Sequence, residues 1–104
     1  MVIEWLKIRV KSELREKFIQ KDTEIWTSAL AKCRGFVGKE VWIDPDTPTD
    51  IILIIRWAKR EDWSGVSSEL LTKTEQEFDQ DFSGHYQIIE QAEYQVRKFP
   101  QMSN

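Results

Sequence analysis

The chain has 104 residues, of which 40% are hydrophobic and 32% charged, and its formal net charge is −3. This length predicts one domain with a single core and leaves no room for a second. The acidic balance argues against a nucleic-acid partner, and no window reaches the ~20 apolar residues that a membrane span requires. Because the N-terminus also lacks signal-peptide features, we expect a cytoplasmic protein. We place the domain at residues 1–99 and a C-terminal tail at 100–104.

Cysteine and histidine each occur once, as Cys33 and His85. A lone cysteine cannot form an internal disulfide bond, and one histidine with one cysteine does not make a typical metal-binding cluster. The sequence therefore fits a reducing compartment and predicts neither a metal site nor another cofactor.

The first half of the chain predicts a strand followed by a helix. Residues 2–10 alternate in polarity, which indicates a strand with Ile3 and Trp5 together on one face. From residue 12 to residue 33, apolar side chains recur at helical spacing, and Ser12 is the expected N-cap.

The rest of the chain predicts three more strands and a second helix. Residues 51–58 are apolar at consecutive positions, which is typical of a strand buried on both faces. A helical stripe over 60–83 is expected to break near Ser64 and Gly65. The other strands are expected at 36–43 and at 86–96, the last of them irregular around Glu90.

The element order βαββαβ predicts an α+β fold of the ferredoxin-like type, with an antiparallel sheet. Right-handed crossovers place both helices on one face of that sheet. The other face carries Ile3, Trp5 and part of 51–58, a larger apolar patch than a monomer usually exposes. We therefore expect a homodimer that forms through the open sheet face, as in a dimeric α/β barrel.

Three segments resemble a small family of uncharacterised cyanobacterial proteins. They are Val-Ile-Glu-Trp-Leu at 2–6, Glu-Ile-Trp-Thr at 24–27 and Gly-Phe-Val-Gly-Lys-Glu-Val-Trp at 35–42. The similarity runs over most of the chain. That family resembles a branch of the antibiotic biosynthesis monooxygenase-like dimeric α/β barrels, which Arg-Trp-Ala-Lys-Arg-Glu-Asp-Trp at 56–63 also resembles.

The resemblance implies the fold more strongly than it implies a reaction. Members of the superfamily often have a histidine one or two helical turns beyond the tryptophan of the third strand. Val66 occupies that place here, which weakens a haem-ligand interpretation. The superfamily includes cofactor-free oxygenases, haem-degrading enzymes, isomerases and proteins without known activity, so the fold alone does not transfer a function.

Tryptophan is unusually frequent, and aromatic walls suit a flat conjugated ligand held between helices and sheet. Core packing and the dimer interface explain these residues equally simply, and this structural interpretation is the favoured one. The candidate ligand-binding residues are Trp5, Trp26, Trp42, Trp57 and Trp63.

Three further residues are candidates for catalysis. His85, before the last strand, has a side chain suited to a general base, although a loop or edge role is the simpler interpretation. Asp22 interrupts the polar side of the first helix and could present a charge to a pocket. Arg56 lies in the most apolar strand and could hold a substrate carboxylate, although an intersubunit ion pair with Glu4, Glu40 or Glu90 is favoured.

These residues permit three functions. The first is a monooxygenase-like enzyme that needs no metal or flavin and acts on a small aromatic or quinone-like molecule. His85 or Asp22 would then move a proton, and Arg56 would stabilise an oxyanion. The second is a non-catalytic protein that binds a hydrophobic or tetrapyrrole molecule. The third is a dimeric stress-response or interaction module whose core is filled by its own side chains.

Overall fold

The computed structural model describes residues 1–98 and confirms the predicted architecture. Four strands form one antiparallel sheet in the order β2-β3-β1-β4. Their bounds are Val2–Val10 for β1, Phe36–Ile43 for β2, Asp50–Trp57 for β3 and Tyr86–Gln95 for β4. This is the ferredoxin-like arrangement. The expected tail at 100–104 lies outside the described residues.

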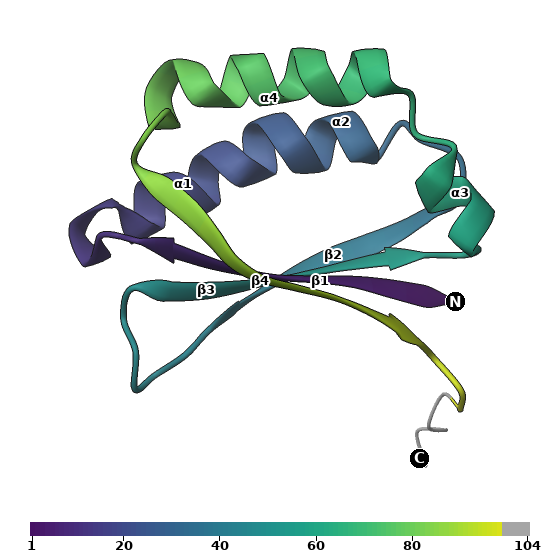
Figure 1. Ribbon diagram of the computed structural model, residues 1–104, viewed down its shortest axis with the longest axis horizontal. Coiled ribbons are helices and arrows are strands. Elements are labelled where there is room, and N and C mark those ends of the chain that lie inside the picture. Colours follow the sequence, from purple (N-terminus) through teal and green to yellow (C-terminus); the bar gives the residue numbers. More distant parts are fainter. Residues whose placement is uncertain (99–104) are drawn as a thin grey trace.

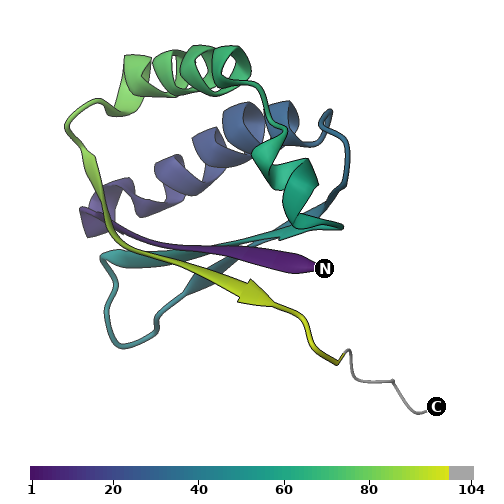
Figure 2. The same ribbon diagram turned by 45° about the vertical axis from the view of Figure 1, so that its right-hand side comes forward.

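Two helical segments cover one face of the sheet (Figures 1 and 2). The first is a run over residues 12–30, made of η1 (Ser12–Leu14), α1 (Arg15–Asp22), η2 (Thr23–Thr27) and α2 (Ser28–Leu30). The second comprises α3 (Arg60–Ser64) and α4 (Ser68–Phe82), which confirms the predicted break near Gly65. Within the described residues, no helix is both long and apolar enough to cross a membrane.

The boundaries of the helices follow from local hydrogen bonding, with one correction to the expected caps. Ser12 is not the N-cap, because the Leu14 amide donates to the Lys11 carbonyl at 2.9 Å and the helix begins one residue earlier. Ser67 caps α4, where its hydroxyl accepts from the Leu70 amide at 3.1 Å. Gly35 has φ +79°, and a Cβ there would overlap Asp62 of α3.

The core lies between the sheet and the helices. β3 is buried along nearly its whole length, as its unbroken apolar run predicts. At one end of the core, aromatic rings pack edge to face, tilted or stacked, with centroids 5.2–5.6 Å apart; they belong to Phe18, Phe78, Phe82 and Tyr86. Opposite Lys7 and Ile8, β4 contains a register shift that leaves Ile89 as an extra residue, so the predicted irregularity near Glu90 is present.

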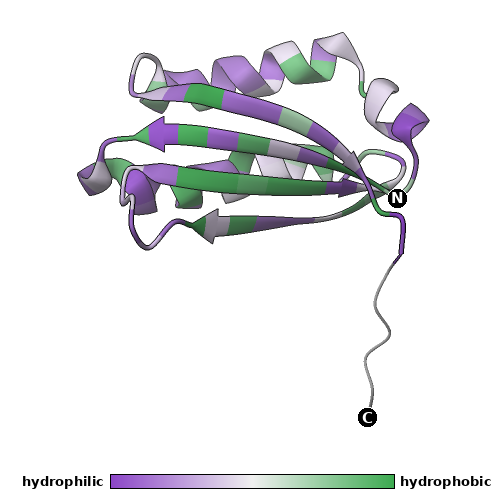
Figure 3. Cartoon of the chain, turned by 60° about the horizontal axis from the view of Figure 1, so that its bottom comes forward, coloured by the Kyte–Doolittle hydropathy of each residue, from purple (hydrophilic) through white to green (hydrophobic). Residues whose placement is uncertain are grey.

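Within residues 1–98, the opposite face of the sheet carries no helix (Figure 3). Strand register places the side chains of Ile3, Trp5, Ile54 and Trp42 on this open face, because Ile3 pairs with Arg56, and Trp5 with Ile54. Trp42 is 47% exposed there. The expectation that Ile3 and Trp5 lie on a face without helices therefore agrees with the strand register.

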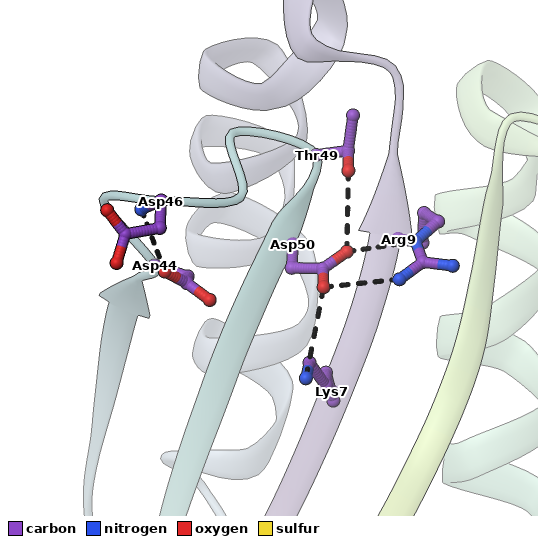
Figure 4. A network of polar contacts seen from close by, with 6 residues as sticks. All are labelled: Lys7, Arg9, Asp44, Asp46, Thr49 and Asp50. Atoms are coloured by element: carbon purple, nitrogen blue, oxygen red, sulfur yellow. Dashed lines mark hydrogen bonds and ion pairs between the residues drawn. The ribbon is translucent and has the colours of Figure 1, made fainter.

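At one end of the open face, Asp50 pairs with basic side chains (Figure 4). The Arg9 guanidinium donates to both carboxylate oxygens of Asp50, at 2.9 and 3.3 Å, and the Lys7 ammonium lies 3.9 Å away. Hydrogen bonding from Arg9 lowers the pKa of Asp50 below its usual value. Asp50 is covered by Arg9 and Lys7 at the surface of the sheet. Water around these partly exposed basic side chains weakens their electrostatic attraction to Asp50.

We expect Asp50→Asn to lower the free energy of unfolding by about 1 kcal/mol at neutral pH. An acid with a lowered pKa stabilises the fold above its usual pKa, and this stabilisation is lost as the pH falls through the folded-state value. Urea unfolding of wild type and variant should therefore give curves that converge at acidic pH. A difference that stays constant from neutral to acidic pH would contradict the assignment.

Candidate functional site

A cavity of about 510 Å³ lies between the sheet and the helices, within the usual range for small-molecule sites. Every strand and both helical segments contribute to its wall. Most of the wall is apolar, with Leu6, Leu30 and Ile55 among its residues. The core is therefore not completely filled by its own side chains.

Three of the five tryptophans predicted to bind a ligand line this cavity. Trp57 is buried at the end of β3, Trp26 lies in η2, and Trp63 lies in α3. Trp5 and Trp42 do not line it, because their strand positions place them on the open face. The structure thus divides the tryptophans between the cavity and the open face.

The segment that carries Trp26 is a π-helical turn, in which hydrogen bonds span five residues. Such turns occur frequently at functional sites, because the wider turn offsets the following residues relative to a regular α-helix. Here it joins Asp22, at the end of α1, to Trp26 and then to Leu30, and all three line the cavity. The spacing of apolar residues in this segment does not distinguish the π-helical turn from α-helix.

Asp22 lies on the inner side of its helix rather than on the polar side that the sequence predicted. Its carboxylate lies 2.6 Å from the Lys39 ammonium, and only 2% of the Asp22 side chain and 3% of the Lys39 side chain are exposed. Within residues 1–98, Asp22 Oδ2 meets no donor other than this ammonium. Burial raises the pKa of Asp22, although the charge of Lys39 opposes part of this shift.

A second carboxylate in the cavity belongs to Glu4, on the inward face of β1. Trp57 Nε1 donates a long hydrogen bond of 3.5 Å to Glu4 Oε1. Among residues 1–98, no cation lies within ion-pair distance of Glu4. Burial raises the pKa of Glu4, while Trp57, Lys39 and then Arg60 act in the opposite direction.

Arg60 forms the charged part of the wall near α3. Its guanidinium lies 4.0 Å from the centre of the Trp63 ring and donates to Glu93 at 3.0 Å. It therefore both stacks on an aromatic side chain and pairs with a carboxylate, which fixes its position at the cavity.

The other two predicted catalytic residues lie away from the cavity wall. Arg56 is on the open face, and its guanidinium donates to Glu40 of the same chain at 2.8 and 3.0 Å. The ion pair expected between subunits is thus formed within one chain in this structure. His85 is an exposed residue between α4 and β4. The structure brings neither of them together with Asp22.

Glu4 and Lys39 were not predicted as cavity residues. The strand pattern contained a signal for Glu4, because a carboxylate at this position shares its face with Val2 and Leu6. Within residues 1–98, no group of three or more histidine, cysteine, aspartate or glutamate side chains is placed to hold a metal ion.

No protein-family description matches this sequence, and no curated protein matches it. Solved structures do match its fold. A proposed antibiotic biosynthesis monooxygenase from Deinococcus radiodurans is 13% identical, with a TM-score of 0.73 and 100% of each chain covered. HapK from Hahella chejuensis is 15% identical, with a TM-score of 0.72 and 100% of each chain covered.

SnoaB from Streptomyces nogalater, a cofactor-independent oxygenase, is 13% identical over 94% of each chain, with a TM-score of 0.67. The chain has the fold of the antibiotic biosynthesis monooxygenase-like proteins. These structures confirm the expected fold, and the family named in the resemblance stays a prediction. Identities this low establish a shared architecture, so a function must be argued from this chain's own cavity.

Proposed function

We propose that the protein is a cofactor-independent, monooxygenase-like enzyme that acts on a small aromatic or quinone-like molecule in this cavity, and that it works as a homodimer. The observation that carries the proposal is an apolar cavity of about 510 Å³ that contains both tryptophans and buried charges. Apolar walls accommodate a flat ligand, and buried polar groups orient it or move protons.

The buried charges favour catalysis over passive binding. A protein that only stores a hydrophobic molecule has no need for Lys39, Asp22 and Glu4 around the ligand, because burying charged groups is energetically costly. The likeness to SnoaB supports the same choice at the level of fold. In this proposal Asp22 acts in the cavity, whereas Arg56 and His85 have no contact with the ligand.

Without a cofactor, the substrate itself must supply the electrons that reduce oxygen. A substrate carbon that carries two hydrogen atoms would lose both, gain one oxygen atom as a carbonyl, and release the second oxygen atom as water. One oxygen molecule would thus be consumed for each substrate molecule.

The test is tryptophan fluorescence titration with a panel of hydroxyaromatic compounds, anthrones and quinones, followed by oxygen uptake with every compound that binds. We expect saturable quenching by at least one of them, with oxygen uptake that depends on the protein.

Val66→Trp should weaken binding at least about tenfold, because the larger side chain enters the cavity from its wall. The control is Val37→Trp, which adds the same side chain at a position that is 48% exposed. Binding without oxygen uptake would favour the non-catalytic alternative, and no binding would overturn the proposal.

A further inference from the structure

Two charged side chains on the floor of the cavity, Glu4 and Lys39, lie in one row across the sheet. Strand pairing aligns Glu93 of β4 with Glu4 of β1, then with Ile55 of β3, and then with Lys39 of β2. Residues directly opposite one another in a sheet point to the same face, and neighbouring strands lie about 4.8 Å apart. Glu4 and Lys39 therefore flank the apolar side chain of Ile55 on the floor of the cavity.

Both ends of this row have ion-pair partners, whereas Glu4 between them has none among residues 1–98. Glu93 is paired with Arg60, and Lys39 is paired with Asp22, so each of these charges is balanced. Glu4 lies between them without an ion-pair partner among residues 1–98, and Trp57 Nε1 is its one side-chain hydrogen-bond donor there. A carboxylate in this state accepts a proton more readily than one that is held by a cation.

The buried ammonium also has unused donor capacity. Lys39 carries three N–H donors, and Asp22 is its one side-chain partner among the described residues. Because buried donors require acceptors, an oxygen atom of a ligand above Ile55 would complete this site. An oxygen that carries negative charge would be bound most strongly, because it forms a charge-assisted hydrogen bond.

We propose that the cavity selects an aromatic or enolic compound with an acidic hydroxyl group, that Glu4 accepts the proton of that hydroxyl, and that Lys39 binds the resulting oxyanion. This inference rests on the proposed function and specifies the substrate class and the first step. The O–H bond breaks, its electron pair stays on the substrate oxygen, and the proton forms a new O–H bond on the Glu4 carboxylate. No oxidant is consumed in this step, and the anion it forms is a better electron donor for oxygen.

The surrounding charges are compatible with this role. Lys39 on β2 and Arg60 on α3 act on Glu4 electrostatically, and Glu93 on β4 is its cross-strand neighbour. The other charged residues of the cavity wall are Asp22 at the end of α1 and Glu75 on α4. Burial already raises the pKa of Glu4, which makes its carboxylate a stronger base than an exposed glutamate. The paired charge of Asp22 keeps Lys39 in place before the ligand enters.

The experiment uses two matched probes, 7-hydroxycoumarin, whose ionised and neutral forms absorb at different wavelengths, and 7-methoxycoumarin, which has no acidic proton. Absorption spectra are recorded about one pH unit below the pKa of free 7-hydroxycoumarin, where about a tenth of the free probe is ionised. We expect bound 7-hydroxycoumarin to be mainly ionised with wild-type protein. Glu4→Gln cannot accept the proton, so it should release about one proton to the medium for each neutral probe that binds and ionises, whereas the wild type should release almost none; calorimetric titration in buffers of different ionisation enthalpy measures this release. The substitution should leave the affinity for 7-methoxycoumarin unchanged.

A double variant tests Lys39 without leaving a buried charge unpaired. Asp22→Leu with Lys39→Met should bind both probes with similar affinity, and should bind 7-hydroxycoumarin in its neutral form. The matched control for Glu4→Gln is Glu77→Gln, which removes an exposed carboxylate from α4 and should behave as wild type. Neutral bound probe in the wild type, or release of the hydroxyl proton to the medium when the wild type binds the probe, would overturn this inference alone. Failure of both probes to bind the wild-type protein would overturn it together with the proposed function.

Discussion

Lys39→Met should lower the free energy of unfolding by about 3–5 kcal/mol, the largest single-site effect that we expect. The substitution leaves the Asp22 carboxylate buried without the ammonium that now lies 2.6 Å away. Guanidinium unfolding at neutral pH measures the loss. The cost should fall as the pH is lowered, because an acid whose folded-state pKa is raised destabilises the fold only when it is ionised.

The double variant Asp22→Leu with Lys39→Met separates charge from packing. Removing both charges leaves apolar side chains of similar volume, which often stabilise a protein as well as the buried pair did. We expect its stability to lie within about 1 kcal/mol of wild type, or above it. A double variant as unstable as Lys39→Met would show that packing of these side chains, rather than their pairing, stabilises this part of the fold.

Trp42→Lys should raise the dissociation constant of the proposed dimer about 30-fold or more, since a central interface tryptophan typically contributes 2 kcal/mol or more. Trp42 lies on the open face, 47% exposed, and its Nε1 donates to Glu40 at 3.0 Å. Arg56 donates to the same Glu40 carboxylate, so apolar and paired polar groups lie together on this face. Light scattering over a concentration series measures the change.

Ile43→Lys is the matched control for the dimer. Ile43 is 43% exposed and directly follows Trp42, but its pairing with Ile51 places it on the opposite side of the sheet. Its substitution by lysine should therefore leave the mass at two chains. A wild-type mass of one chain at micromolar concentration would contradict the dimer, and equal weakening by both substitutions would contradict the choice of interface.

The fold could be predicted from the sequence because its strands and helices have strong local patterns. The run at 51–58 is apolar at every position up to Arg56, and such a short unbroken run after turn-forming residues is typical of a buried strand. Gly35 and Gly84 adopt the positive φ values that end helices or precede strands. The order of these elements then limits the topology to very few arrangements.

The site was less predictable because it depends on how elements pack rather than on their patterns. Asp22 follows a polar stretch of helix, and its burial arises only when Lys39 of a distant strand meets it. Arg56 looks unusual in an apolar strand, but register places it on the open face beside Glu40. Of the five tryptophans, only the chain fold decides which ones reach the cavity.

The central claim is that the cavity between sheet and helices receives the ligand, and indole N–H signals in a nitrogen-15 NMR spectrum test it most directly. Single tryptophan-to-phenylalanine variants assign the five signals, and 7-methoxycoumarin is then titrated into wild-type protein. Binding in the cavity predicts that the signals of Trp26, Trp57 and Trp63 move to saturation, while those of Trp5 and Trp42 stay in place. Shifts confined to Trp5 and Trp42 would place the ligand on the open face and contradict the account.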